Sequence, residues 1–400
     1  MKKTFILASL MMVFSLQLSA QEKEAETTKP YEFTDVIVNK ITPVKNQSRS
    51  GTCWCFSTMA TLESDILKSG KGEVDLSEMW VVRHAYLEKL KKYVRMHGAN
   101  NFGPGGNAHD VPNMIREYGI VPEEVYPGLN YGTDIHVHGE LNNLLKAYGD
   151  VLIKNPNKEL STAWIEGANG ILDAYFGVCP EKFTYNGKEY TPQSYAAELG
   201  LNPDDYVSIT SYTHHPFYTT FAVEVPDNWA WGPSYNVPLN EMMQIIDQTI
   251  ENGYTIGWGS DVSEKGFVYK RGFAVLPETD IKAMDNNEQD RWVALTEAER
   301  QEQMYKFDEI LPEKKVTQEM RQQMFDNYTT TDDHGMQIYG IAKDQNGNKY
   351  YKVKNSWGDE QLLGGSFYVS EPFVAAKTIN ILINKKALSQ EMADKLGIER

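Results

Sequence analysis

The sequence has few cysteines, few positive charges and no long apolar segment beyond its first residues. It contains 3 cysteines in 400 residues, too few for a disulfide scaffold. Its 39 Lys and Arg stand against 55 Asp and Glu, which gives a net charge of −16. This acidic balance disfavours nucleic acid and anionic membrane surfaces as the main partners, although it does not exclude a local basic patch. The 41% hydrophobic and 12% aromatic residues are typical of a folded chain with two to three lobes.

The one long apolar run opens the chain. Lys2 and Lys3 precede the run from Phe5 to Phe14, and the small residue Ala20 follows shortly after it. A basic start, a short apolar core and a small residue at the end predict a signal peptide over residues 1–20. The run is shorter than the roughly 20 apolar residues that a membrane helix needs, so an uncleaved anchor is the weaker alternative. We therefore expect an exported protein, periplasmic or secreted, with no membrane insertion after the signal is removed.

Helical patterns come first in the chain and strand patterns come last. Apolar residues recur at helical spacing in segments 53–68, 76–93 and 111–118. From Met336 the period becomes two, and a turn at Asn346-Gly347 predicts an antiparallel hairpin over 336–343 and 349–355. This order predicts an α+β fold with a helical lobe and an antiparallel β lobe, and disfavours alternating βαβ units.

The most informative residue is Cys53, because it begins the predicted helix 53–68. A thiol at a helix N-terminus lies near the positive end of the helix dipole and near unpaired N–H groups, which favour the nucleophilic thiolate. Gln47 lies six residues upstream across a turn that contains Gly51. Its side-chain amide and the Cys53 backbone N–H are therefore candidates to bind a developing oxyanion.

A cysteine nucleophile needs an oriented base, and the hairpin supplies one. His334 precedes the first strand, and Asn355 ends the second. The Asn355 side-chain oxygen could accept a hydrogen bond from one imidazole nitrogen and leave the other facing Cys53. Trp357 follows closely and could shield that hydrogen bond from water.

These motifs together resemble the papain-like cysteine peptidases. The resemblance rests on Gln47, Gly51-Thr52-Cys53-Trp54, Asp333-His334-Gly335 and Asn355-Ser356-Trp357-Gly358. It implies a two-lobed fold with an extended peptide substrate in the cleft, and it implies no metal and no organic cofactor. By the same resemblance Cys53, His334, Asn355 and Gln47 are catalytic, and Gly105, Gly106 and Trp357 bind the substrate.

The spacing of the motifs indicates a branch of this family. His334 follows Cys53 by about 280 residues, whereas about 130–150 are usual in papain-type enzymes. This large insertion resembles the bleomycin hydrolase and aminopeptidase C branch, whose members form hexameric rings, so a homo-oligomer is expected by resemblance only. The expected organisation is a signal peptide at 1–20, a polar spacer at 21–35, a peptidase domain at 36–386 with an insertion at roughly 131–328, and a helical tail at 387–400.

The C-terminus bears on which peptide bond is cut. Enzymes resembling aminopeptidase C carry a C-terminal arm whose carboxylate meets the α-amine of the substrate. Here a predicted strand at 379–383 and a helical segment at 389–396 are followed by Gly397–Arg400. Two interpretations stay open. Either this short tail reaches the cleft and the enzyme is an aminopeptidase, which is slightly favoured, or the cleft is open and the enzyme is an endopeptidase.

Several alternatives are weaker. A catalytically dead peptide-binding protein is expected to have lost Cys53, His334 or Gln47, and all three are present. A thiol-redox pair normally has two residues between its cysteines, whereas one separates Cys53 from Cys55. We expect Cys55 to point away from the nucleophile, and a Cys55–Cys179 disulfide is the lesser alternative. His136, His138, His214 and His215 have no partners at metal-ligand spacing, so no metal site is predicted.

Overall fold

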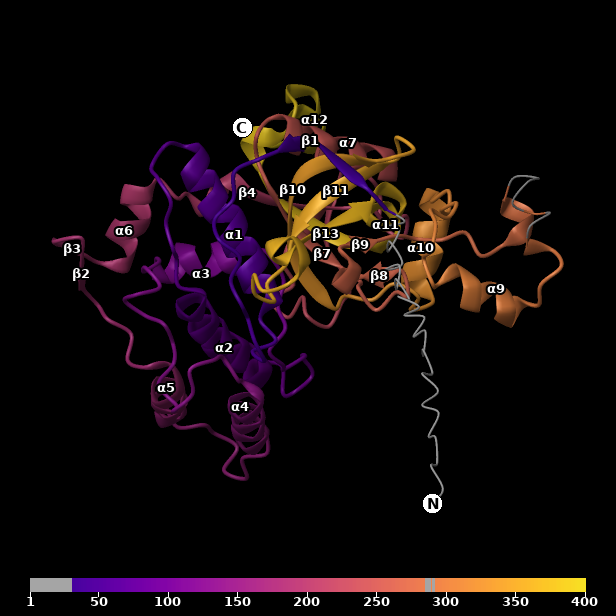
Figure 1. Cartoon of the computed structure of the whole chain (residues 1–400). Coiled ribbons are helices and arrows are strands. Elements are labelled where there is room, and N and C mark those ends of the chain that lie inside the picture. The colour runs from indigo at the N-terminus through magenta and orange to yellow at the C-terminus, as the bar shows by residue number, and fades with distance from the viewer. Residues whose placement is uncertain (1–30, 285–288, 290–291) are drawn as a thin grey trace, which may run out of the picture.

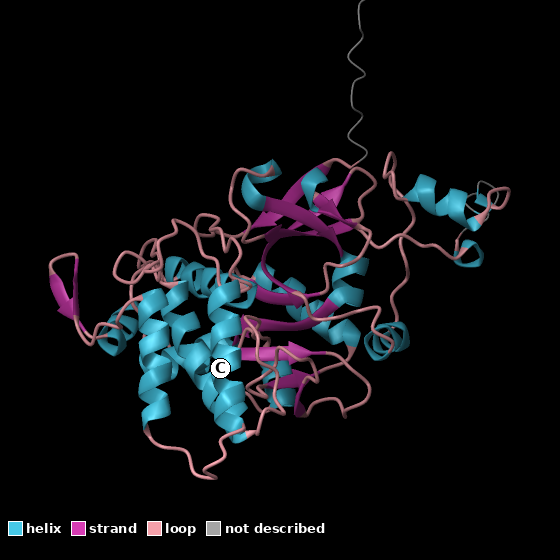
Figure 2. Cartoon of the chain, turned by 90° about the horizontal axis from the view of Figure 1, so that it is seen from below, coloured by secondary structure: helices cyan, strands magenta, loops and turns pink. Residues whose placement is uncertain are grey.

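The computed structural model describes residues 31–284, 289 and 292–400. The predicted signal peptide lies outside the described residues. The chain forms a helical lobe on one side of the molecule and, on the other, a sheet lobe that also carries helices (Figures 1 and 2). The predicted α+β class is confirmed.

The helical lobe comes from the first half of the chain. Its elements are α1 (Cys53–Lys68), α2 (Glu78–Arg95), α3 (Asp110–Tyr118), α4 (Gly139–Ile153), α5 (Ala163–Phe176), the hairpin β2 (Phe183–Tyr185) and β3 (Lys188–Tyr190), and α6 (Pro192–Leu199). The long helix α2 begins at a cap where the Ser77 side chain accepts a hydrogen bond from the Trp80 N–H. The three helices predicted from apolar spacing are confirmed, within two residues at each end.

The sheet lobe is built mainly from the second half. Its strands are β1 (Phe33–Val38), β4 (Tyr206–Thr210), β5 (Thr220–Ala222), β6 (Pro233–Asn236), β7 (Ile256–Ser260), β8 (Phe267–Val268), β9 (Phe273–Ala274), β10 (His334–Asp344), β11 (Lys349–Lys354), β12 (Ser366–Ser370) and β13 (Thr378–Asn384). They form one sheet in the order β5-β6-β4-β13-β7-β10-β11-β12-β9-β8, with β1 paired to β10. The predicted hairpin is confirmed as β10 and β11. The predicted antiparallel β lobe is confirmed for most strand pairs, and the structure adds two parallel pairs, β4–β6 and β9–β12.

Helices surround this sheet. They are α7 (Leu239–Glu251), α9 (Glu297–Met304), α10 (Gln318–Asp326), α11 (Glu371–Lys377) and α12 (Gln390–Leu396). None of the helices in the part of the chain that the structure describes is long and apolar enough to cross a membrane.

One predicted boundary differs from the structure. The polar spacer was expected to reach residue 35, but β1 already begins at Phe33. The reason is aromatic packing, because Tyr31 lies 4.4 Å from Phe273 and Phe33 lies 4.3 Å from Tyr368 between ring centroids. The insertion at roughly 131–328 is not a separate unit. It contributes α4 to α6 to the helical lobe and β4 to β9 to the sheet.

The two lobes meet where α1 packs on β10. A Cβ atom at Gly335 would lie 2.8 Å from Ser57 Oγ and 3.1 Å from the Cys53 carbonyl oxygen, so only glycine allows this approach. Further along, Gln337 Nε2 donates hydrogen bonds to Ala60 O at 3.0 Å and to Ser64 Oγ at 2.9 Å. The start of β10 is thereby held against the start of α1.

Candidate active site

A cleft of about 450 Å³ lies between the lobes at the start of α1. Six of the seven predicted site residues line it: Gln47, Cys53, Gly105, Gly106, His334 and Trp357. The seventh, Asn355, lies behind His334 and is buried. Residues that are distant in the sequence therefore come together in one cavity.

Cys53 is the first residue of α1 and is partly exposed to the cleft. The preceding Thr52 makes no side-chain capping bond, so no side-chain oxygen from the cap competes at this helix end. Desolvation by the surrounding protein raises the pKa of the Cys53 thiol to about 12, and hydrogen bonds from the Gly335 and Trp54 backbones act in the opposite direction. The sequence predicted a thiolate favoured by the helix end. Desolvation opposes that effect and is the larger cause.

His334 and Asn355 form the predicted pair. The His334 Nε2 and Asn355 Oδ1 atoms are 2.8 Å apart, so Nε2 carries the proton and Nδ1 can accept one. The Trp357 ring stacks on the imidazole with ring centroids 4.7 Å apart. Burial lowers the pKa of His334 to about 4, while the bond to Asn355 raises it. The imidazole is therefore oriented and covered on one face.

Gln47 is oriented by a residue that the sequence analysis did not single out for this purpose. The Ser356 hydroxyl donates a hydrogen bond to Gln47 Oε1 at 2.7 Å, and the Gln47 N–H donates to the Ser356 carbonyl at 2.9 Å. Because Oε1 is occupied, the Nε2 group of Gln47 is the end left for the cleft. Ser356 directly follows Asn355, which binds His334. One short segment therefore orients both Gln47 and His334.

The predicted glycines form one wall of the cleft. A Cβ atom at Gly106 would lie 2.8 Å from the Trp54 ring, and Trp54 Nε1 donates to the Pro104 carbonyl at 3.1 Å. Behind this wall the Lys89 ammonium donates to the carbonyl groups of Gly103 and Gly105. The loop is thus fixed to α1 and α2.

Two carboxylates that the sequence analysis missed also line the cleft. They are Asp227, which follows β5, and Asp332, two residues before His334. Burial raises the pKa of Asp332 to about 8, and the charges of Asp227 and Asp333 add to this effect. Burial also raises the pKa of Asp227, against the nearby Lys89 cation. Asp227 and Asp332 are more than 100 residues apart in the sequence, so no local pattern links them. Only the folded chain shows that both line the same cleft.

The other two cysteines have no part in the cleft. Cys55 is buried, and its thiol lies 3.5 Å from the Glu78 carbonyl oxygen. Cys179 lies 3.7 Å from both His84 and Tyr126. All three cysteines are free, so the considered Cys55–Cys179 disulfide is absent from the structure.

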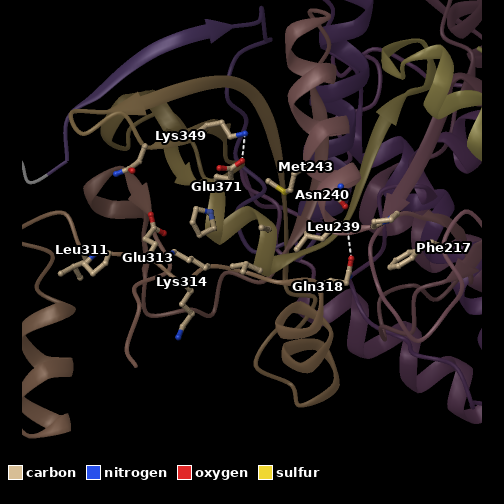
Figure 3. A pocket seen from close by; sticks show the side chains of 17 residues that line it. Phe217, Leu239, Asn240, Met243, Leu311, Glu313, Lys314, Gln318, Lys349 and Glu371 are labelled. Atoms are coloured by element: carbon tan, nitrogen blue, oxygen red, sulfur yellow. Dashed lines mark hydrogen bonds and ion pairs between the residues drawn. The ribbon is translucent and has the colours of Figure 1, made fainter. Parts of the chain in front are cut away.

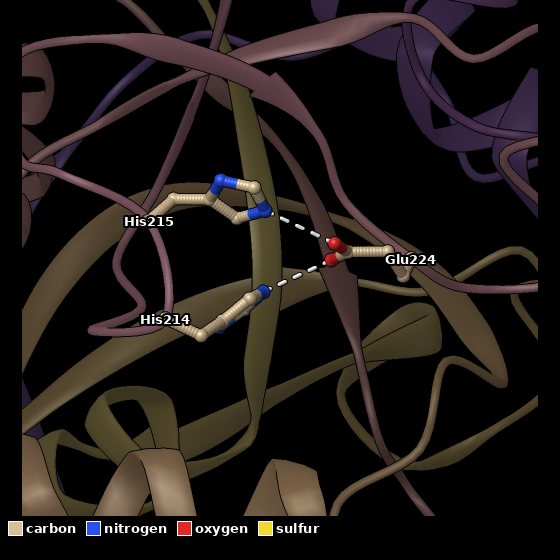
Figure 4. A group of neighbouring side chains, drawn as sticks. All are labelled: His214, His215 and Glu224. Atoms are coloured by element: carbon tan, nitrogen blue, oxygen red, sulfur yellow. Dashed lines mark hydrogen bonds and ion pairs between the residues drawn. The ribbon is translucent and has the colours of Figure 1, made fainter.

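One group of side chains outside the cleft could contact a metal ion. His214 and His215 each point a ring Nε2 at the Glu224 carboxylate, at 2.9 Å and 3.0 Å (Figure 4). These are hydrogen-bond distances, so one carboxylate bridging two imidazoles accounts for the arrangement without an ion. The ring centroids of His136 and His138 are 6.1 Å apart. Neither residue belongs to a group of possible metal ligands among the described residues.

A larger cavity of about 810 Å³ lies on another part of the sheet lobe, between α7, α11 and the segment at 311–318 (Figure 3). Lys349 and Glu371 pair across it at 2.5 Å, and the Leu239 N–H donates to Gln318 Oε1 at 2.6 Å. None of its lining residues is a predicted site residue. The smaller cleft at Cys53 is therefore the candidate for chemistry.

The C-terminal tail does not line the cleft. Residues Met392, Ala393, Leu396 and Ile398 are buried in the core of the sheet lobe. The segment before the tail meets the far end of α1, where Asn384 Nδ2 donates to Asp65 Oδ2 at 2.9 Å. Since a helix rises about 1.5 Å per residue, that point lies roughly 18 Å along α1 from Cys53. The interpretation in which the short tail reaches the cleft is wrong, because the apolar face of α12 docks elsewhere.

Comparisons with known proteins agree with this geometry. The model of the papain family cysteine proteases matches residues 31–185, and that of the Peptidase C1-like family matches residues 286–399. Aminopeptidase C of Lactobacillus delbrueckii subsp. lactis is 23% identical over 391 residues, which cover 87% of this chain and 81% of the relative. Aminopeptidase G of the same organism is 22% identical, with 96% and 89% covered.

A solved structure has the same fold. The crystal structure of PepW from Lactobacillus rhamnosis HN001 matches with a TM-score of 0.66 at 22% identity. The match covers 91% of this chain and 84% of that chain.

Proposed function

Since the chain belongs to the papain-like cysteine peptidases, in the branch of aminopeptidase C and bleomycin hydrolase, we propose that it removes amino acids from the N-termini of peptides. Hydrolysis by a cysteine peptidase is the established part, and release of the first residue is the proposed part. The observation that carries the proposal is the arrangement of Cys53, His334 and Gln47 in one cleft that Asp227 and Asp332 also line. Relatives named aminopeptidase C and aminopeptidase G support it.

The proposed reaction proceeds through a thioester. Cys53 Sγ attacks the peptide carbonyl as His334 Nδ1 takes the thiol proton, and His334 then gives this proton to the leaving amine. Water hydrolyses the thioester with His334 as the base. Gln47 Nε2 and the Cys53 N–H are the proposed donors to the oxyanion in both steps.

We also propose that the protein is exported. The basic residues Lys2 and Lys3, the apolar run from Phe5 to Phe14 and the small residue Ala20 support this proposal. N-terminal sequencing of the mature protein is expected to find Gln21 first. A mature chain that begins at Met1 would contradict cleavage.

Internal cleavage is the competing function. It is favoured by the packing of residues Met392–Ile398, which lie in the sheet-lobe core and do not line the cleft. The test compares an amino-acid fluorogenic amide that has a free α-amine with the same compound N-acetylated. We expect kcat/KM to be at least about 10-fold higher for the free amine, which is what one charge-assisted hydrogen bond contributes. Equal rates on the two compounds would establish an endopeptidase.

The reactivity of Cys53 should depend on pH because His334 must be unprotonated to accept the thiol proton. Below about pH 4, where the pKa of His334 lies, both groups hold protons and the imidazole cannot accept one. We therefore expect the rate of alkylation by neutral iodoacetamide to rise as the pH passes about 4, and the macroscopic pKa belongs to the pair. In His334→Ala the thiol has no base, and because burial raises its own pKa to about 12, the rise should move to well above pH 8. A parent enzyme that reacts only above pH 8 would show that Cys53 acts alone.

A further inference from the structure

Three acidic side chains line the cleft, and the third, Asp333, accepts a hydrogen bond from the Val262 N–H. In the described part of the chain no cation pairs with the other two, Asp227 and Asp332. Asp332 Oδ2 is fully buried and has no hydrogen-bond partner. Asp227 accepts one hydrogen bond, from Asn101 Nδ2 at 3.1 Å. Neither carboxylate forms an ion pair with any residue in the described ranges 31–284, 289 and 292–400. Two carboxyl groups that face one cavity without a counter-charge resist ionising together, and the pKa of Asp332 is accordingly raised to about 8. A cationic ligand bound between them would favour the charged form of both.

The nearest ammonium group of the protein is already engaged. Lys89 is buried and donates to the carbonyl groups of Gly103 and Gly105 from behind the glycine wall. It offsets part of the Asp227 charge but forms no ion pair with Asp227. No ammonium group of the described chain is therefore left to form an ion pair with Asp227 or Asp332.

The two carboxylates lie close to the reacting atoms. Both Asp332 and Asp227 raise the pKa of the Cys53 thiol by their charge, so both are within electrostatic range of the sulfur. Asp332 is two residues before His334, and Asp227 comes from the segment after β5. A group bound between them is near the carbonyl that Cys53 attacks.

Asp227 also limits the length of the cleft. A Cβ atom at Gly105 would lie 1.9 Å from Asp227 Oδ2, so the carboxylate lies directly on the face of this glycine. By resemblance, Gly105 and Gly106 pair with the substrate backbone. Because Asp227 lies against Gly105, a substrate that pairs with these glycines would have its N-terminal side next to the Asp227 carboxyl group.

We propose that Asp227 and Asp332 bind the α-ammonium group of the first substrate residue, and that Asp227 blocks longer or N-acylated chains. The proposal rests on the proposed aminopeptidase function and names the side chains that select the free N-terminus. A peptide α-amine has a pKa near 8 and is largely protonated at neutral pH. Its three N–H donors match two carboxylate acceptors, and the first peptide bond then lies at Cys53.

This assignment explains how selection of a free N-terminus works without the C-terminal tail. The acidic groups come from the segment after β5 and from the segment before β10, and both line the cleft that holds Cys53. The last residues of the chain instead stabilise the sheet lobe. In this proposal, side chains of the cleft supply the negative charge that binds the substrate amine, in place of a C-terminal carboxylate.

The experiment measures kcat/KM for three fluorogenic amides of one amino acid: the free amine, the N-acetyl form and the des-amino analogue. The enzymes are the parent, Asp227→Asn, Asp332→Asn and the double variant. Asn has nearly the same shape as Asp but no charge. The control Asp359→Asn removes an exposed carboxylate that does not line the cleft. Because each enzyme is compared with itself on three substrates, partial loss of folding cancels from the ratios.

We expect the parent to prefer the free amine. Each Asn variant should lose roughly 10- to 100-fold in kcat/KM on the free amine, which is the usual cost of removing a charged partner. The same variants should change little on the des-amino analogue, and Asp359→Asn should keep the parent ratio. Asp227→Ala, which clears the face of Gly105, should gain activity on the N-acetyl substrate.

Two outcomes overturn different statements. If the parent cuts the N-acetyl and free substrates equally, the aminopeptidase function itself fails. If the parent prefers the free amine and both Asn variants keep that preference, the function stands and the assignment of Asp227 and Asp332 fails. A carboxylate pair also suits a divalent cation. Loss of the parent's free-amine preference on dialysis against EDTA would therefore assign the site to a metal and overturn the ammonium proposal.

Discussion

Replacing Cys53 by alanine is expected to lower kcat by roughly four to six orders of magnitude, as in other enzymes that lose a covalent nucleophile. The thiol lies at the start of α1 in the cleft, and no other cysteine lines that cleft. No thioester can form without it. The measurement is hydrolysis of a free-amine fluorogenic amide under single-turnover and steady-state conditions, with a melting curve to show that the variant is folded.

The matched control is Cys55→Ala, which removes the neighbouring thiol. Cys55 is buried in the helical core and contacts the Glu78 carbonyl. Its loss is expected to reduce stability by about 1 kcal/mol and to leave kcat close to that of the parent, because the side chain points away from the cleft. Parent-like activity in Cys53→Ala, or complete loss in Cys55→Ala, would contradict the assignment of the nucleophile.

Replacing Gln47 by alanine is expected to lower kcat about 100- to 1,000-fold with little change in KM. An oxyanion donor acts mainly in the transition state, so its removal affects the chemical step more than substrate binding. Gln47 is buried beside Cys53, and its Oε1 is held by Ser356. The measurement is the separate determination of kcat and KM for one substrate.

Ser356→Ala is the graded companion of this variant. It leaves the Gln47 amide in place but removes the hydroxyl that orients it. We therefore expect its kcat to lie between the kcat of the parent and that of Gln47→Ala. Gln47→Glu should resemble Gln47→Ala or be slower, since a carboxylate cannot donate to an oxyanion. A Gln47→Ala variant that is as fast as the parent would mean that other donors bind the oxyanion.

Much of the site was predictable because its signals are local. A helix that starts at Cys53, a strand that starts near His334 and a turn at Asn346-Gly347 each follow from short patterns of apolar and turn residues. Gln47 is close to Cys53 along the chain. The family motifs then link these pieces in order.

Other features depend on contacts between distant segments. The insertion at roughly 131–328 has no sequence signal that assigns β4 and β7 to the same sheet as β10 and β13. Strand pairing depends on partners far along the chain, and the mixed parallel pairs could not be read from period-two patterns. The orientation of Gln47 by Ser356 likewise joins residues that are 309 positions apart.

Residue types and short-range spacing predicted the reaction class, the candidate nucleophile and base, and the helices and hairpin that carry them. Tertiary structure decided the ionisation environment of Cys53 and His334, since burial cannot be read from a motif. It also decided that α12 docks in the sheet-lobe core, away from the cleft. Finally, it brought Asp227 and Asp332 to one end of the cleft, because only the packing of the two lobes places residues so distant in the chain around the same few atoms.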